Sequence, residues 1–196
     1  VLDEAKLREL AGSWGRYRDV DGDGIPYRSL PDTGMPSFFT RGSGHNDMAQ
    51  YTEKPDDYVK NMDRLARKFD TARSLVPAPI LDATPNAKVG IIAFGSSHWA
   101  VQESRDQLRE ESGIETSYLR LRAYPFPPAV DEFIRNHERI YIVEQNRDAQ
   151  MRSLLINEVA VAPSRMFAVL HYDGTPITAR FITQAITHHM EARAAE

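Results

Sequence analysis

The 196-residue sequence contains no cysteine. Disulfides, thiolate nucleophiles, cysteine-ligated iron–sulfur clusters and cysteine-type zinc sites are therefore excluded for this chain. Long hydrophobic runs are also absent, since none approaches the roughly 18 apolar residues that a membrane-spanning helix needs. No signal peptide is recognisable. We therefore expect no membrane association and a cytoplasmic location.

A surplus of basic residues is missing as well. Lys and Arg number 24 against 28 Asp and Glu, which gives a net charge of -4 and a pI near 5.9. Because nucleic-acid binders use a basic surplus to neutralise phosphates, we expect no nucleic-acid partner. The hydrophobic share of 41% is ordinary for a globular domain with an appendage. The chain starts at Val1 within a helical pattern, so we expect a fragment of a longer polypeptide.

The first part of the chain shows little regular patterning. Residues 2–11 predict a short amphipathic helix, and residues 55–75 predict a longer one that begins at a proline. About 40 residues between them lack periodicity, but their scattered aromatic side chains favour an ordered loop over disorder. The proline-interrupted segment 77–86 is the predicted connector. We place the domain boundary there, between residues 1–84 and 85–196.

From residue 88 onward, strand and helix patterns alternate with short links. The predicted strands are 88–94, 116–121, 140–143 and 166–171. The predicted helices are 99–111, 129–137, one around 151–155, and 178–192. This alternation indicates right-handed crossovers. The predicted fold class is α/β, a three-layer α/β/α sandwich with a mostly parallel sheet, preceded by an irregular loop-rich and helical N-terminal segment.

A dense polar cluster follows the predicted strand 140–143. Open α/β sheets place ligand and partner contacts at the carboxyl ends of their strands. These side chains could contact a ligand, a partner subunit or one another, and they offer no evident nucleophile and base pair. Internal hydrogen bonding is favoured in an isolated domain, and a docking edge in a larger assembly. The candidate interface residues are Glu144, Gln145, Asn146, Arg147 and Gln150.

Three carboxylates recur at alternate positions in Asp19, Asp21 and Asp23, followed by Gly24. This spacing is typical of loops that wrap oxygen ligands around Ca²⁺ or Mg²⁺. The motif is incomplete, because its twelfth position is Leu30 rather than a bidentate Glu. The alternative is an Asp/Gly turn without an ion.

Two further stretches are candidate binding segments. Arg41 and His45 flank a Gly-Ser-Gly sequence that could bind an anion or present a general acid or base, and the alternative is a surface loop with local hydrogen bonds. Gly95, Ser96 and Ser97 lie at a strand-to-helix turn whose N–H groups could receive a phosphate. There the alternative is that Ser97 caps the following helix.

Several stretches together resemble one family, the α subunits of 2-oxoacid:ferredoxin (acceptor) oxidoreductases, especially the 2-oxoglutarate type. They occur in the family's order and cover nearly the whole chain. The resembling stretches are YRDVDGDGIPYRSLP (17–31), FFTRGSGHND (38–47), YVKNMDRLARKF (58–69), YLRLRAYPFP (118–127), VEQNRDAQMRSLL (143–155) and LHYDGTPIT (170–178).

The resemblance implies that residues 85–196 form a domain similar to the transketolase C-terminal domain. Residues 1–84 would be the end of a pyrimidine-binding domain and its connecting segment. The complete enzyme would decarboxylate a 2-oxoacid with thiamine diphosphate, Mg²⁺, iron–sulfur clusters and CoA, and form an acyl-CoA. Implied partners are a β subunit, ferredoxin and a second copy of the chain.

The resemblance places the catalytic motif upstream of this chain and the diphosphate site on the β subunit. We therefore expect no catalytic residue in the fragment, which would be structural and inactive alone. Two alternatives stay open. One is a self-contained α/β domain that binds a phosphorylated ligand such as CoA at Gly95 to Ser97, and the other is a relative that uses NAD as electron acceptor.

Overall fold

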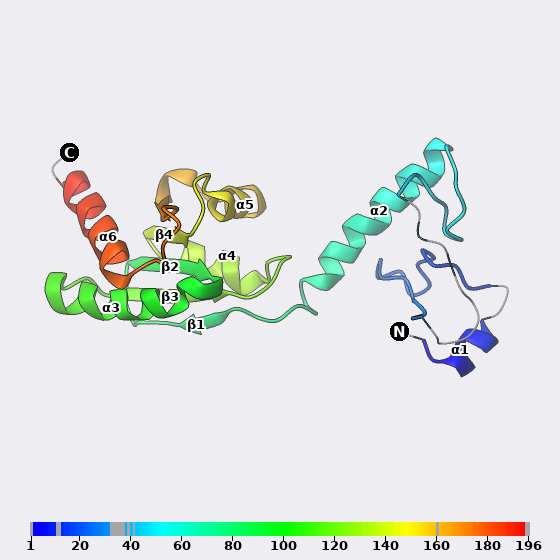
Figure 1. The fold of residues 1–196 in the computed structure, drawn as a ribbon, viewed down its shortest axis with the longest axis horizontal. Helices are drawn as coiled ribbons and strands as arrows, with labels where there is room; N and C mark the ends of the chain where they lie inside the picture. Colours follow the sequence, from blue (N-terminus) through cyan, green and yellow to red (C-terminus); the bar gives the residue numbers. More distant parts are fainter. Residues whose placement is uncertain are drawn as a thin grey trace. The chain divides into compact units, whose positions relative to one another are not determined.

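The computed structural model describes residues 2–10, 13–31, 38, 40, 42–159 and 161–194. The chain divides into two compact units, Val1–Leu75 and Val76–Glu196, called here the N-terminal unit and the sheet unit (Figure 1). The division lies nine residues before the boundary expected from sequence, because the connector itself supplies a strand to the sheet.

The sheet unit is built on five strands in the order β1-β3-β2-β4-β5. The strands are β1 (Ile80–Asp82), β2 (Val89–Phe94), β3 (Thr116–Leu121), β4 (Arg139–Glu144) and β5 (Met166–Leu170). Strands β2 to β5 run parallel, and only β1 pairs antiparallel, with Ile80 opposite Arg120. The predicted α/β class with a mostly parallel sheet is confirmed. Strand β1 was not predicted.

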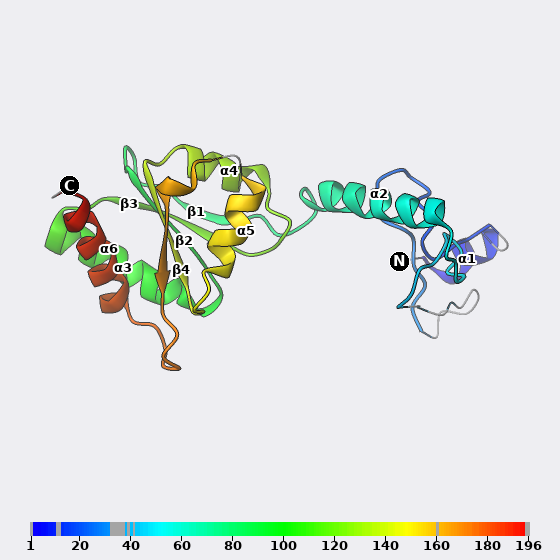
Figure 2. The ribbon, with the colours of Figure 1, turned by 90° about the horizontal axis from the view of Figure 1, so that it is seen from above.

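Four helices cover the two faces of this sheet. They are α3 (His98–Ser112), α4 (Pro128–Arg135), α5 (Gln150–Glu158) and α6 (Ala179–Ala194). Figure 2 shows α3 and α6 on one side of the strands and α4 and α5 on the other, which gives the three predicted layers. A short 3-10 turn, η1 (Gly95–Ser97), joins β2 to α3.

The core consists of two apolar clusters, one on each face of the sheet. Ile91 and Tyr141 pack with α3 and α6, whereas their neighbours Ile92 and Ile142 pack with α4 and α5. Successive residues of a strand point to opposite faces, so strands covered on both sides read as continuous apolar runs. Gly90 is required by this packing, since a Cβ there would lie 2.8 Å from atoms of Phe133 and Ile140.

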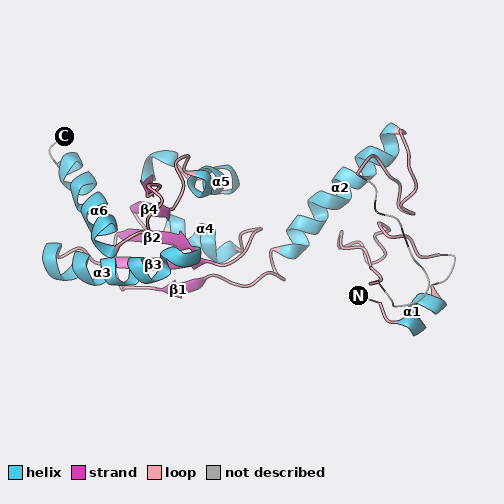
Figure 3. Ribbon diagram, viewed as in Figure 1, coloured by secondary structure: helices cyan, strands magenta, loops and turns pink. Residues whose placement is uncertain are grey.

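Among its described residues, the N-terminal unit holds two helices, α1 (Glu4–Glu9) and α2 (Pro55–Ala72) (Figure 3). The described residues between the two helices are irregular. The backbone N–H of Lys6 donates to Asp3, which caps α1. Leu2 and Trp14 form a small apolar cluster. Both predicted helices of this part of the chain are confirmed, with shorter bounds.

Helix α2 directs its polar side into the N-terminal unit. Arg64 is its one buried residue among those described, with 6% of its surface exposed. Large apolar side chains of this helix form a stripe that faces outward instead, and Tyr58 is 61% and Phe69 44% exposed. None of the helices in the described part of the chain combines the length and apolar character that crossing a bilayer requires.

Candidate functional site

The strand order creates a switch point at the carboxyl ends of β2 and β4. The chain leaves β2 through α3 toward β3 on one side, and it leaves β4 through α5 toward β5 on the other. Connections that diverge in this way leave a crevice outside the strand ends, where open α/β sheets bind ligands.

A cavity of about 500 Å³ occupies this position, and we call it the switch-point cavity. It joins two groups of residues that the sequence singled out separately, the turn at Gly95 to Ser97 and part of the polar edge after β4. The sequence analysis did not predict the apolar residues of this cavity, Phe94, Met151 and Leu154, as part of a site. The lining residues are Phe94, Gly95, Ser96, Ser97, Gln145, Asn146, Gln150, Met151 and Leu154.

Gln145 connects the two sides of the switch-point cavity. Its side-chain Nε2 donates to the hydroxyls of Ser96 and Ser97, each at 3.1 Å. Ser97 stands at the N-cap position of α3, but its side chain makes no capping hydrogen bond. The capping interpretation of Ser97 is therefore wrong, because its hydroxyl is engaged across the cavity.

Glu144 is fully buried and holds the start of α5. Its carboxylate accepts the backbone N–H groups of Met151 at 2.7 Å and Arg152 at 2.9 Å, and the side-chain amide of Asn146 at 2.8 Å. The first N–H groups of a helix have no partner within the helix, and a negative charge there complements the helix dipole. Glu144 is thus an internal anchor rather than an interface side chain, which corrects its place in the predicted docking edge.

The rest of the polar edge lies nearer the surface. Arg147 is exposed and pairs with Asp148, Nε to Oδ1 at 2.7 Å. The side-chain oxygen of Asn146 accepts the backbone N–H groups of Asp148 and Gln150. Arg147 and Gln150 therefore keep their place as candidate interface residues, together with Gln145, whereas Asn146 shapes the loop.

The switch-point cavity has an uncharged lining. Its polar groups are the hydroxyls of Ser96 and Ser97 and the amides of Gln145, Asn146 and Gln150. Phosphate sites at helix N-termini commonly add a Lys or Arg to the backbone N–H groups. This cavity can offer hydrogen bonds to a neutral polar ligand, but no cationic side chain to a phosphate.

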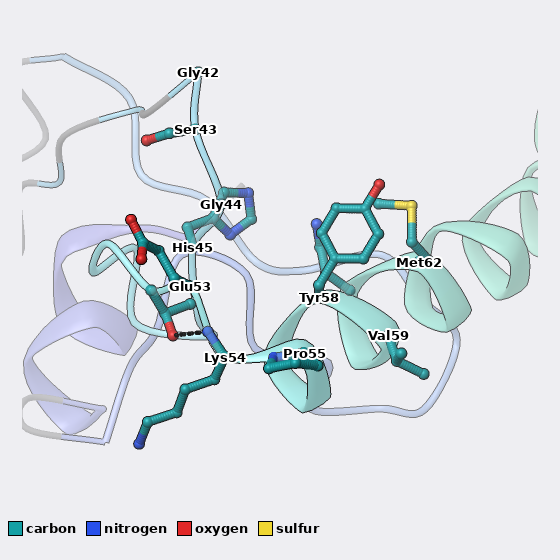
Figure 4. Close-up of a pocket in the computed structure, with 12 residues that line it drawn as sticks. Gly42, Ser43, Gly44, His45, Glu53, Lys54, Pro55, Tyr58, Val59 and Met62 are labelled. Carbon is teal, nitrogen blue, oxygen red and sulfur yellow. Dashed lines mark hydrogen bonds between the residues drawn. The ribbon is translucent and has the colours of Figure 1, made fainter.

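The second candidate segment lies in the N-terminal unit, against the start of α2. His45 lines a cavity of about 510 Å³ between its own loop and the first turns of the helix (Figure 4). Its half-buried ring stacks on Tyr17, with the ring centroids 3.8 Å apart, and its Nδ1 lies 3.4 Å from the carbonyl of Asn46. Arg41 lies outside the described residues. A catalytic role for His45 stays a prediction.

The three aspartates of the predicted metal loop turn to separate partners. Asp19 accepts the backbone N–H of Gly24, Asp21 accepts the hydroxyl of Tyr27, and Asp23 accepts the backbone N–H of Ile25. No group of three His, Asp or Glu side chains that could hold a metal ion occurs among the described residues. The geometry found is that of an Asp/Gly turn.

This turn packs closely on α2 through Gly24. A Cβ at Gly24 would lie 2.3 Å from the backbone nitrogen of Lys68, and Thr71 donates to the carbonyl of Asp23 at 2.6 Å. Partial burial acts to raise the pKa of Asp19, but the hydrogen bonds from Gly24 and Arg67 outweigh it and lower that pKa below its ordinary value. The carboxylate thus fastens the turn to the helix.

The chain is similar in sequence to a known protein. No family model matches it. It is 27% identical over 181 residues to 2-oxoacid:ferredoxin oxidoreductase 2, subunit alpha, of Aeropyrum pernix, an alignment that covers 90% of this chain and 27% of that protein. The predicted resemblance to such α subunits is confirmed at this level, although its 2-oxoglutarate type is not. The chain spans about a quarter of the length of this curated relative.

One solved structure shows the same fold. The 2-oxoglutarate:ferredoxin oxidoreductase of Magnetococcus marinus, solved with 2-oxoglutarate, coenzyme A and succinyl-CoA bound, aligns with a TM-score of 0.74 at 19% identity. The alignment covers 90% of this chain and 31% of that one. The α chain of a probable 2-oxoacid ferredoxin oxidoreductase from Thermoplasma acidophilum covers 58% of this chain and 97% of its own, with a TM-score of 0.36 at 22% identity, too low to support a structural argument.

Proposed function

We propose that the chain is the C-terminal portion of the α subunit of a 2-oxoacid:ferredoxin oxidoreductase. The complete enzyme would decarboxylate a 2-oxoacid on thiamine diphosphate, form an acyl-CoA and pass the electrons to ferredoxin. The observation that carries this proposal is the 27% identity over 181 residues with the Aeropyrum pernix α subunit. The family resemblance of the sequence stretches favours 2-oxoglutarate as the substrate. A cytoplasmic location belongs to the same proposal.

Within that enzyme the chain would do structural work. We assign residues 85–196 to a transketolase C-terminal-like domain and residues 1–84 to the end of the pyrimidine-binding domain with its connecting segment. The exposed members of the polar edge, Gln145, Arg147 and Gln150, would dock against the β subunit, another domain or a second copy of the chain. Ferredoxin would contact the complete assembly.

The residues of this chain do not fit the redox and metal groups of such an enzyme. Without cysteine there is no thiolate to ligate an iron–sulfur cluster. In the described ranges, no group of three His, Asp or Glu side chains could coordinate Mg²⁺. We therefore assign the clusters, the thiamine diphosphate and its Mg²⁺ to other parts of the complete enzyme.

The test is co-expression of the full-length α polypeptide with a candidate β subunit, followed by methyl viologen reduction. We expect CoA-dependent reduction with 2-oxoglutarate, and less with pyruvate or a branched-chain 2-oxoacid. The isolated 196-residue chain serves as the inactive control. An assembled complex that reduces the dye with none of these 2-oxoacids would overturn the proposal.

A second candidate function is a self-contained module that binds a phosphorylated ligand such as CoA. The observation in its favour is the switch-point cavity of about 500 Å³, which includes the turn at Gly95 to Ser97. Its uncharged lining counts against a phosphate ligand. Titration of the isolated chain with CoA and nucleotides separates the two functions, since micromolar binding lost in Gln145→Ala would favour the module.

A further inference from the structure

Arg64 is a buried cation in the N-terminal unit that pairs with no carboxylate among the residues the structure describes. Only 6% of its surface is exposed. Its Nη1 donates to the carbonyl of Gly24 at 3.1 Å and its Nη2 to the side chain of Asn61 at 2.8 Å. Its buried Nε has no hydrogen-bond partner among the described residues. Buried charges in proteins are normally paired, so this guanidinium calls for an anion.

Arg64 lines a cleft of about 580 Å³ at the centre of a basic cluster, the Arg64 cleft. Four cationic and two carboxylate side chains lie on its walls. The remaining lining is small or apolar. The lining residues are Arg18, Asp19, Gly22, Asp47, Met48, Lys60, Arg64 and Arg67.

Both carboxylates in the Arg64 cleft are already engaged. Asp19 pairs with Arg67 at 3.1 Å, and Asp47 pairs with Lys60. Arg18 donates to the backbone carbonyl of Ser13 at 2.7 Å and makes no ion pair with a described residue. The cleft lining therefore carries two more positive than negative side chains, and Arg18 and Arg64 make no ion pair with another described residue.

Charged neighbours act on the pKa of Arg64 in both directions. Burial lowers the pKa of Arg64, and the charge of Arg16 adds to that effect, while Asp19, Asp47 and Tyr17 oppose it. An arginine side chain nevertheless stays protonated in proteins. A charged cleft with low-dielectric walls concentrates its field and attracts counter-ions of opposite sign.

We propose that the Arg64 cleft binds the phosphate group of a small molecule. A planar guanidinium matches the oxygens of a phosphate in a fork of two hydrogen bonds, and a surplus of two positive side chains matches a dianion. This site differs from the Gly95 to Ser97 turn, where no cationic side chain lines the cavity. It goes beyond the oxidoreductase proposal, which assigns no ligand to the N-terminal unit.

Sequence reasoning missed this site because it followed only the start and length of this helix and did not consider its basic side chains. A signal was present in Lys60, Arg64 and Arg67, which recur at intervals of four and three residues on α2 and therefore share one side of the helix. Arg18 comes from the Asp/Gly turn region, and only the docking of that region on α2 brings it to the same cleft.

The test is isothermal titration of the 196-residue chain with pyrophosphate and inorganic phosphate at low ionic strength. We expect saturable one-to-one binding. Arg18→Gln should weaken pyrophosphate binding about tenfold, since it removes a charge-assisted hydrogen bond. Arg64→Lys keeps the charge but not the fork and should weaken binding by a similar factor. Arg8→Gln, which removes an equal charge from α1 outside the cleft, should bind like the wild type.

Each remaining outcome decides the matter. No saturable heat with either probe at millimolar concentration would overturn the proposal, and so would equal affinities for the wild type, Arg18→Gln and Arg64→Lys. An equal loss in Arg8→Gln would also overturn it, by revealing unspecific charge attraction. Tighter binding of succinate than of pyrophosphate would overturn the phosphate assignment. If circular dichroism shows that Arg64→Lys does not fold, the comparison of Arg18→Gln with the wild type decides, because Arg18 is exposed and its replacement should not disturb the fold.

Discussion

The buried carboxylate of Glu144 provides a quantitative test of how the sheet unit is held together. In Glu144→Ala, the backbone N–H groups of Met151 and Arg152 lose their acceptor in a site that water does not reach. Each hydrogen bond to a charged group contributes about 1.5–3 kcal/mol, and truncation leaves a cavity besides. We expect the free energy of unfolding to fall by about 3–5 kcal/mol, a loss in the range typical of a broken buried network.

Glu144→Gln is the more conservative change. Met151 and Arg152 donate to different carboxylate oxygens, and the amide replaces one of these oxygens with an NH₂ group. One of the two helix N–H groups therefore loses its acceptor, and we expect a loss of about 2 kcal/mol. Asp148→Asn is the matched control, because this carboxylate is exposed and pairs only on the surface, where the expected change is within about 0.5 kcal/mol.

Urea denaturation followed by far-ultraviolet circular dichroism measures these differences. Amide hydrogen exchange adds a local readout, since the N–H groups of Met151 and Arg152 should exchange faster in Glu144→Gln than in the wild type. A Glu144→Gln protein as stable as the Asp148→Asn control, with unchanged exchange at these two amides, would refute the anchoring role.

Three further perturbations test other parts of the structure. Gly24→Ala should lower the free energy of unfolding, measured by urea denaturation, by several kcal/mol more than Gly22→Ala. Both glycines have a positive φ, but of the two only Gly24 lies against the α2 backbone, and equal losses would contradict this close packing. Arg147→Ala should leave the melting temperature unchanged and weaken co-purification with a β subunit, and a variant that unfolds would show that Arg147 supports the fold instead. The hydrogen bond from Arg105 lowers the pKa of Asp82 in the folded chain below its ordinary value of 3.8. The ionised Asp82 therefore stabilises the fold above pH 3.8, and this contribution is lost as the pH falls through the lowered pKa. Asp82→Asn should therefore flatten the decline in melting temperature below pH 4, by a small amount because Asp82 is half exposed; identical acid profiles would contradict the pairing.

The parallel strands were predictable because their signal is local. Strand β3 matches the predicted bounds 116–121. Strands β2 and β5 differ from the prediction by one residue at one end, and β4 by one residue at each end. Their apolar runs reflect burial on both faces. Strand β1 carries no such signal, since its three residues are all exposed and its existence depends on pairing with β3. Pairing of this kind depends on contacts distant in sequence.

The candidate site was predictable only in pieces. The Gly95 to Ser97 turn and the polar edge were each visible in the sequence, but their meeting depends on β2 lying beside β4. At the Asp/Gly loop the spacing left a metal site and a plain turn as alternatives, and the contacts found are those of a turn that docks on α2. The burial of Arg64 was likewise invisible, since periodicity locates the faces of a helix without showing which face is covered.

The outward apolar stripe of α2 has a thermodynamic consequence. The heat capacity and the denaturant dependence of unfolding both grow with the apolar surface that unfolding exposes. In the N-terminal unit that surface is small, because Tyr58 and Phe69 already face outward and the helix is held by Arg64, Thr71 and the close approach of Gly24. Per residue, this unit should therefore unfold with a shallower urea dependence and a smaller heat-capacity increment than the sheet unit.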